Sequence, residues 1–376
     1  MLKKRNLIVG AGFSGAVLAQ QIASELGESV LLVDKKSHIA GLSYDYKNKD
    51  GLWIHKYGPH IFHTNIDKVW EYLKKYSEFN HYSHRVNALV DGKMVPLPFN
   101  FNTIDALFPE EKASSYKQKL KSAYPAKQTI SILEFLENKD PEISALANYI
   151  YEKIFLNYTI KQWGKKPEDI DKSITARVPV VLDYDNRYFH DKYQGIPQNG
   201  YTNLIKNILD EKNVEVLLNT NYKSIIDSED FERIFITGSI DEYFDYKYGV
   251  LPYRSVEYKF EKFDSEFYQN VAMTNYPNDF DYKRIHEYKH YLNETPKGYK
   301  KTIIAKEYFE EFELNKNERY YPSLDKDNIK LHSKYLEDVK QFKNLYFFGR
   351  LGDYKYYNMD SAINRAFEVF DYIKKR

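Results

Sequence analysis

The first 34 residues of the chain combine a strand, a glycine-rich turn, a helix and a second strand. The apolar run at residues 7–9 is followed by Gly10, Gly12 and Gly15, and then by helical spacing. In such a turn the first glycine permits a tight bend, the second lets the backbone approach a pyrophosphate, and the third lets helix and strand pack closely. The next apolar run ends at Asp34, about 20 residues further on, where a carboxylate can reach a ribose hydroxyl. This spacing predicts a dinucleotide-binding unit.

Composition restricts the classes of protein to which the chain can belong. Lys and Arg number 55 and Asp and Glu 54, so the net charge of +1 offers no basic surface for nucleic acid or for a membrane. Cysteine is absent, which excludes disulfides, thiolate metal sites and cysteine nucleophiles. No apolar run approaches the ~18 residues of a membrane span, and the charged start "MLKKR" leaves no room for a signal peptide. We therefore expect a soluble cytoplasmic protein without a nucleic-acid partner, a membrane segment or a metal site.

The end of the chain repeats the pattern of its beginning. Residues 344–367, "NLYFFGRLGDYKYYNMDSAINRAF", read as strand, glycine turn and helix. A second helix N-terminus directed at a flavin ring would stabilise the negative charge of the reduced ring. A nicotinamide enzyme usually has one such fold, and no second glycine fingerprint for NAD(P)H is present. The two-ended arrangement predicts FAD as the cofactor, without a dedicated pyridine-nucleotide domain.

The middle of the chain predicts two inserts in this nucleotide fold. Residues 103–163 read mainly as helices, and residues 249–314 as strands of antiparallel style. We therefore expect an α/β protein with an FAD-binding Rossmann-like domain built from both chain ends, a helical-bundle insert and an antiparallel β-sheet insert. The FAD-binding domain is assigned residues 1–80, 195–238 and 325–376, the helical domain residues 100–165, and the sheet domain residues 81–99, 179–194 and 239–324.

Longer motifs carry a resemblance to a known family. "HKYGPHIFHT" (55–64), "NYTIKQWG" (157–164), "NRYFHDKYQGIPQNGYT" (186–202), "RIHEYKHY" (284–291) and "FGRLGDYKYYNMD" (348–360) occur in this order. Together they resemble the prokaryotic UDP-galactopyranose mutases over essentially the whole chain. The resemblance implies an isomerase that interconverts UDP-galactopyranose and UDP-galactofuranose, or their N-acetylgalactosamine forms. It also implies that FAD is active when reduced, its N5 attacking the anomeric carbon while UDP leaves, and that the protein is a homodimer.

The same resemblance implies roles for individual residues. Arg177 and Arg284 match arginines that bind the diphosphate, and His63 lies beside the flavin with His60. Trp163 packs near the uridine on a mobile loop, residues 163–178, that also carries Arg177. The other expected cofactor contacts, besides the glycine turn and Asp34, are Arg350, Asn358, Met359 and Ser361, with Asn358 in place of the acidic residue of many relatives. The other expected substrate contacts are Phe155, Tyr158, Thr159, Tyr188, Arg254, Asn275, Tyr321 and Tyr356.

Two other functions share the nucleotide fold. An FAD oxidoreductase of the amine-oxidase type would transfer a hydride and would therefore consume an electron donor or produce peroxide with each turnover. A dinucleotide-binding sensor without enzymatic activity would not need the arginines and the polar, aromatic site residues.

Overall fold

The computed structural model describes residues 5–170, 178–291 and 300–375. Contacts between residues divide the chain into two compact units. The first unit contains Met1–His81, Asp191–Tyr253 and Phe312–Arg376, and the second contains Tyr82–His190 and Arg254–Glu311. Each unit is described by itself below.

A five-stranded parallel sheet forms the centre of the first unit, in the order β11-β2-β1-β12-β18. Its strands are β1 (Asn6–Val9), β2 (Val30–Val33), β11 (Val214–Leu217), β12 (Arg233–Ile236) and β18 (Leu345–Phe347). The first two strands are fully buried, as their apolar runs predict. Since β18 comes from the end of the chain and pairs with β12, the prediction of a Rossmann-like sheet built from both chain ends is confirmed.

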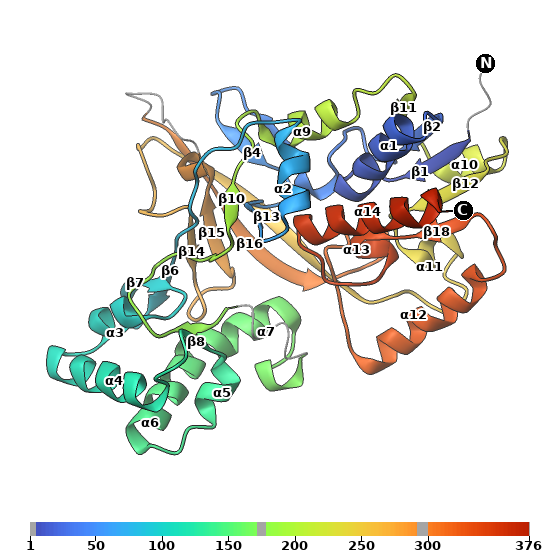
Figure 1. Ribbon diagram of the computed structural model, residues 1–376. Coiled ribbons are helices and arrows are strands. Elements are labelled where there is room, and N and C mark those ends of the chain that lie inside the picture. Colours follow the sequence, from blue (N-terminus) through green and yellow to red (C-terminus); the bar gives the residue numbers. More distant parts are fainter. Residues whose placement is uncertain (1–4, 171–177, 292–299, 376) are drawn as a thin grey trace. The chain divides into compact units, whose positions relative to one another are not determined.

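Helices from distant parts of the sequence lie beside this sheet. Helices α1 (Phe13–Glu25) and α14 (Met359–Lys374) lie side by side (Figure 1) and make extensive contacts. Gly27, with φ of +66°, ends the α1 segment in the left-handed conformation that glycine favours. The other helices of this unit are α2 (Asp67–Lys74), α9 (Gly200–Ile208), α10 (Tyr222–Ile226), α11 (Ile240–Tyr243), α12 (Lys326–Val339), α13 (Gly349–Gly352) and the 3₁₀ turn Gly41–Ser43. Its short strands are β3 (Asp45–Lys47), β4 (Trp53–His55), β5 (Phe62–Thr64), β10 (Tyr193–Gly195) and β17 (Tyr321–Pro322).

A mostly antiparallel sheet forms one part of the second unit, in the order β13-β16-β15-β14-β6-β7. Its strands are β6 (Val86–Val90), β7 (Lys93–Leu97), β13 (Tyr253–Phe263), β14 (Met273–Asn275), β15 (Arg284–Glu287) and β16 (Thr302–Glu311). Strands β6 and β7 form a hairpin around Asp91 and Gly92, whose φ values of 47° and 77° are typical of a type I′ turn. The exception is β14, which pairs with β6 in parallel.

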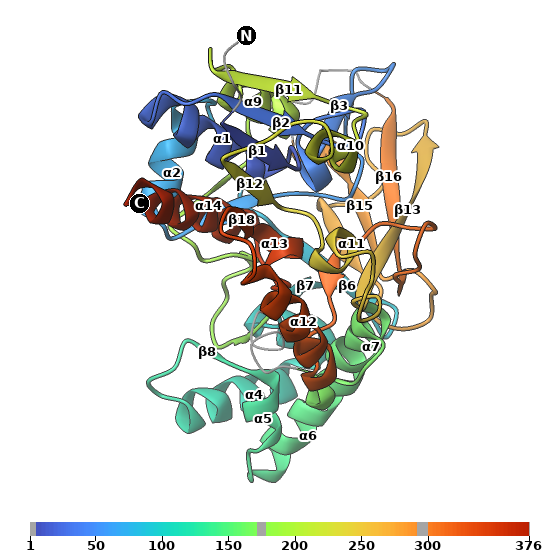
Figure 2. The same cartoon turned by 90° about the vertical axis from the view of Figure 1, so that its right-hand side faces the viewer.

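Helices form the other part of the second unit (Figure 2). They are α3 (Phe101–Leu107), α4 (Glu110–Ala123), α5 (Ile132–Leu136), α6 (Pro141–Ile150), a π-helical segment (Tyr151–Leu156), α7 (Asn157–Trp163) and 3₁₀ turns at Pro167–Asp169 and Tyr288–Tyr291, with the strand pair β8 (Thr129–Ile130) and β9 (Val180–Val181). Buried residues of the helices, such as Phe135 and Leu146, share one core with Ala88 and Val95 of the sheet. The helical and sheet segments therefore lie in one unit, and their finer division into two domains stays a prediction. None of the helices in the described ranges is both long enough and apolar enough to cross a membrane.

Candidate functional site

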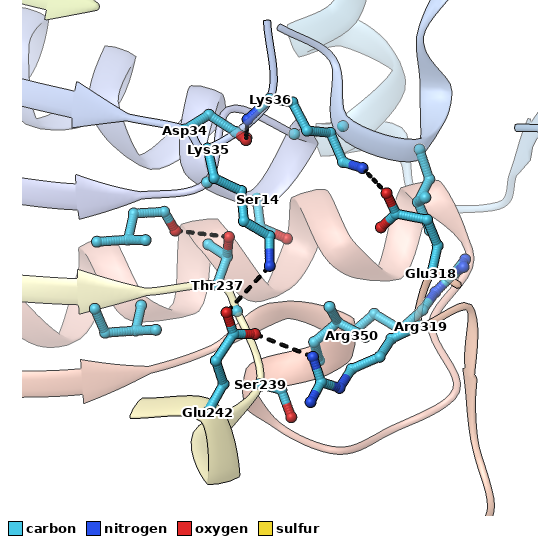
Figure 3. Close-up of a pocket in the computed structure, with 18 of the residues that line it drawn as sticks. Ser14, Asp34, Lys35, Lys36, Thr237, Ser239, Glu242, Glu318, Arg319 and Arg350 are labelled. Carbon is cyan, nitrogen blue, oxygen red and sulfur yellow. Dashed lines mark hydrogen bonds and ion pairs between the residues drawn. The ribbon is translucent and has the colours of Figure 1, made fainter. Parts of the chain in front are cut away.

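A cavity of about 390 Å³ opens in the first unit, where four parallel strands end (Figure 3). Gly10 follows β1, Asp34 follows β2, Thr237 follows β12 and Arg350 follows β18, and all four line the cavity. Open parallel sheets bind their ligands outside the carboxyl ends of the strands, because the loops that follow the strands meet there. The position and size of the cavity therefore suit a nucleotide.

Glycine is needed at the three positions of the turn for different physical reasons. A Cβ atom on Gly15 would lie 1.9 Å from the Gly10 carbonyl oxygen, and one on Gly10 would lie 2.0 Å from Thr237 Oγ1. These two glycines are required by the protein's own packing. A Cβ on Gly12 would meet only Gly41, at the ordinary contact distance of 3.9 Å, and its φ of −83° suits any residue. Since Gly12 lines the cavity, its missing side chain leaves space for a ligand rather than for the protein.

Two features give the glycine turn its electrostatic character. Gly12 is the N-cap of α1, and the first turn of this 13-residue helix has no acidic side chain, so its N–H groups are available to an anion. The Asp34 carboxylate accepts hydrogen bonds from the backbone N–H of Ala11 and of Lys36, each at 2.8 Å. In this structure Asp34 thus links the glycine turn to the end of β2 through hydrogen bonds. Its expected contact with a ribose hydroxyl stays a prediction.

Charged side chains that the sequence did not indicate line one side of the cavity. Lys36 forms an ion pair with Glu318, and Glu242 pairs with both Lys35, at 3.1 Å, and Arg319, at 3.0 Å (Figure 3). The two lysines follow Asp34 just after the end of β2, and a prediction of this strand could have identified that position. Glu242, Glu318 and Arg319 come from distant segments whose proximity depends on the whole fold. These pairs leave the cavity lining close to neutral overall.

The two histidines of the residue 55–64 motif that were expected at the site, His60 and His63, have different surroundings. His60 lines the cavity, and burial, aided by His55 and Arg350, lowers its pKa to about 3. Its Nδ1 lies 2.8 Å from the Gly58 carbonyl oxygen, which can only accept, so Nδ1 carries the proton and Nε2 is an acceptor. His63 does not line the cavity. Its Nδ1 contacts the Asp191 carboxylate at 2.8 Å, an arrangement that fixes the orientation of the ring.

Most of the remaining expected cofactor residues also lie at the cavity. Arg350, Asn358 and Met359 line it, whereas Gly15 and Ser361 do not. The Arg350 guanidinium donates to the Tyr357 carbonyl at 2.6 and 3.0 Å and lies 5.4 Å from the centre of the Tyr321 ring. Tyr321 in turn stacks on Tyr356, with 5.2 Å between ring centres. In the first unit, two of the four expected substrate tyrosines are thus linked to an arginine of the cavity.

A second group of expected site residues gathers in the second unit around Tyr158 of α7. Arg284, at the start of β15, has its guanidinium carbon 5.6 Å from the centre of the Tyr158 ring. Its Nε lies 3.2 Å from the carboxylate of Glu307 on β16. Asn275 of β14 is the register partner of Arg284 and is buried. Three of the expected substrate residues, Tyr158, Asn275 and Arg284, therefore lie on neighbouring elements of the fold.

Glu307 is the buried counter-charge of this group. It forms an ion pair with Arg284 and a hydrogen bond with Nε2 of His286, whose pKa is lowered by burial. Burial alone would raise the pKa of Glu307, but Arg284, His286 and Lys283 outweigh it and hold the pKa at about 2. Glu307 is therefore a carboxylate at neutral pH, and it fixes Arg284 from behind.

Replacing Glu307 with glutamine is expected to lower the free energy of unfolding by about 3–5 kcal/mol, because buried cations lose their partner. The depressed pKa adds stability that is complete above the usual carboxyl pKa of 4.5 and is lost as the pH falls toward about 2. Thermal unfolding between pH 7 and pH 3 should therefore show a weaker pH dependence for the variant than for the wild type. Glu257→Gln, at an exposed pair with Lys259, is the control and should behave like the wild type. Wild-type stability of Glu307→Gln would contradict this role.

Other expected substrate residues have structural partners in this unit. Arg254 donates from Nε to the Gln162 carbonyl at 2.8 Å and pairs with Glu311, so its guanidinium is already engaged. Phe155 and Tyr188 pack in or against the shared core, and Thr159 is buried. Trp163 is the last residue of α7. Arg177 and its neighbours at residues 171–177 lie outside the described residues, so the expected mobile loop is described only in part.

The sheet, the glycine turn and the cavity at the strand ends define a dinucleotide-binding α/β protein. A family model described as an NAD(P)-binding Rossmann-like domain matches residues 8–76. The model of the UDP-galactopyranose mutase family matches residues 153–356. The chain belongs to the UDP-galactopyranose mutase family, which confirms the resemblance seen in its motifs.

Individual relatives match over nearly the full length. The chain is 37% identical to "Probable UDP-galactopyranose mutase" from Klebsiella pneumoniae, over 99% of this chain and 95% of the relative. It is 34% identical to dTDP-fucopyranose mutase from Escherichia coli, over 98% of each chain. A crystal structure of reduced UDP-galactopyranose mutase matches the fold with a TM-score of 0.73 at 16% identity, over 100% of this chain and 94% of that one.

Proposed function

We propose that this protein is an FAD-dependent mutase that interconverts the pyranose and furanose forms of UDP-galactose. The observation that carries the proposal is a dinucleotide cavity in a chain that belongs, over its whole length, to the UDP-galactopyranose mutase family. The relative named dTDP-fucopyranose mutase suggests that the substrate class is a nucleoside-diphosphate hexose. UDP-N-acetylgalactosamine is a second candidate substrate. A homodimer and a cytoplasmic location stay predictions.

The residues of the cavity fit FAD. The space beside Gly12 admits a pyrophosphate, and the N-terminus of α1 favours its charge. Arg350 and the end of α14 supply polar groups from the other chain end. When bound and reduced, FAD supplies the nucleophile that displaces UDP from the anomeric carbon. His60, neutral and with Nε2 as an acceptor, can receive a hydrogen bond from the cofactor.

Residues of this chain would stabilise the leaving group. Negative charge grows on the diphosphate as the anomeric bond breaks, and a fixed arginine next to it lowers the barrier. We assign this role to Arg284 and, from its motif, to Arg177. In the first unit, the Tyr321 and Tyr356 hydroxyls are groups that could donate to a diphosphate without adding charge.

The proposed function is tested by measuring product formation together with any net oxidation or reduction. Dithionite-reduced protein is expected to convert UDP-galactopyranose, and the oxidised protein is expected to be inactive. UDP-N-acetylgalactosamine and dTDP-fucopyranose are tested in parallel, and products are separated by chromatography. Oxidation of one NADPH, or formation of one peroxide, per product would instead indicate an oxidoreductase and would contradict the proposal.

A further inference from the structure

Lys283 is a buried cation that the proposed function does not use. It directly precedes β15, and its side chain is fully buried. Its Nζ donates a hydrogen bond to Oε1 of Gln162 and lies 3.7 Å from the centre of the Tyr158 ring. In the part of the chain that the structure describes, no carboxylate lies within ion-pair distance of this ammonium. Burial lowers the pKa of Lys283 well below its usual range.

Both close partners of Lys283 belong to α7. Tyr158 and Gln162 are four residues apart, so they share one face of this helix. On the sheet side the ammonium lies 4.6 Å from the ring centre of Phe309 on β16. Lys283 therefore joins α7 to the sheet through its charged end.

Two further cations hold the C-terminal end of α7. Arg254 of β13 donates to the Gln162 carbonyl at 2.8 Å, and Lys161 donates to the Tyr276 carbonyl at 2.7 Å. Cations are favoured at helix C-termini by the helix dipole. The segment before α7, Tyr151–Leu156, is π-helical, and such segments occur often at functional sites. These polar contacts therefore help to set the position of α7.

The Glu307 carboxylate acts on Lys283 through space, but among the described residues no carboxylate pairs with it directly, so stability alone does not explain this buried lysine. Desolvating an ammonium is costly, and replacing buried charged groups with apolar residues of similar volume is often neutral or stabilising. A methionine would fill much of the same space against Tyr158 and Phe309 at lower cost. The presence of a lysine at this buried position is therefore better explained by the groups that it holds in place.

We infer that Lys283 is a positioning residue of the substrate site, which fixes the Tyr158 ring and, through Gln162, the substrate-binding helix α7. This inference rests on the proposed function, in which Tyr158 contacts the nucleotide sugar. The Tyr158 ring contacts both this ammonium and the guanidinium of Arg284. A Tyr158 ring held by Lys283 is placed next to the arginine assigned to the diphosphate.

The test compares Lys283→Met with the wild type in UDP binding, turnover and thermal unfolding. Loss of the cation–π contact is expected to raise the Kd for UDP and the KM about tenfold, with kcat within about twofold. The melting temperature is expected to stay unchanged or to rise. Lys289→Met is the matched control, because Lys289 is also buried, over Phe267 and bonded to the Glu266 carbonyl. It should leave the UDP affinity unchanged.

Two further variants separate positioning from general packing. Lys283→Arg keeps the charge and should bind UDP within about threefold of the wild type. In a Tyr158→Leu background, Lys283→Met should have almost no further effect on UDP affinity, since it acts through that ring. Wild-type UDP affinity in Lys283→Met, or an undiminished effect in the Tyr158→Leu background, would contradict the inference alone. Failure of the wild type to bind UDP would contradict the proposed function as well.

Discussion

Arg284→Ala is expected to lower kcat about a hundredfold, the loss typical of removing one donor to a developing oxyanion, ~3 kcal/mol. The loss should appear in kcat as well as in KM, because the charge on the diphosphate is greater in the transition state than in the bound substrate. Arg284→Lys keeps the charge but not the planar fork, so it should recover only part of the activity. Arg177→Ala is expected to give a loss of similar size.

The controls for Arg284→Ala must separate catalysis from stability, because Arg284 also pairs with the buried Glu307. Activity is therefore measured well below the melting temperature of each variant, and bound FAD is determined in parallel. Bound FAD should stay normal, since Arg284 does not line the cavity. Arg187→Ala removes an exposed arginine of the same unit and should act like the wild type. A kcat/KM of Arg284→Ala close to that of the wild type would remove this residue from the proposed site.

Local signals explain which parts of the fold the sequence could predict. The glycine turn, the Asp91-Gly92 hairpin and the repeated strand, turn and helix at the end of the chain each depend on a few adjacent residues. Their backbone conformations are restricted enough that the residue types identify them. The two chain ends could be assigned to one fold because both carry the pattern of strand, glycine turn and helix.

The charge pairs of the two units could not be predicted in the same way. Glu307 meets Arg284 only because β15 pairs with β16 in the register that places these two residues opposite each other. Glu242 meets Lys35 only when the parallel sheet has formed. In the sequence Lys283 lies in a charged stretch and resembles a surface lysine. The one available signal is that Lys283 and Ile285 are two residues apart in a strand pattern, so a buried Ile285 implies a buried neighbour on that face.

The family resemblance gave residue types but not their contacts. Arg254 was expected to contact substrate, and in the structure it holds the carbonyls at the end of α7. Asp34 was expected to reach a ribose, and in the structure it accepts from two backbone N–H groups. Both roles use the same chemistry of charge-assisted hydrogen bonds, so a motif cannot tell whether the partner is a ligand or the protein itself.

Gly12→Ala is expected to weaken FAD binding about a hundredfold, ~3 kcal/mol, while the protein without FAD folds normally. The added methyl group meets only Gly41 within the protein, at 3.9 Å, and the φ of −83° suits alanine. The same methyl group would lie where the backbone must approach the pyrophosphate. The measurements are the Kd for FAD, from flavin fluorescence, and the melting temperature of the FAD-free protein.

Two other glycines make this prediction specific to the ligand. Gly15→Ala places its Cβ 1.9 Å from the Gly10 carbonyl oxygen, so it should lose both the fold of the turn and FAD. Gly27→Ala meets no atom within 4 Å but must adopt a φ of +66°, so it should lose about 1 kcal/mol of stability and keep FAD. Binding and stability thus change separately at Gly12 and Gly27 and together at Gly15. If Gly12→Ala bound FAD like the wild type, the pyrophosphate would not lie against this turn, and the cavity at the ends of β1 and β2 would have to hold a different part of the cofactor or none of it.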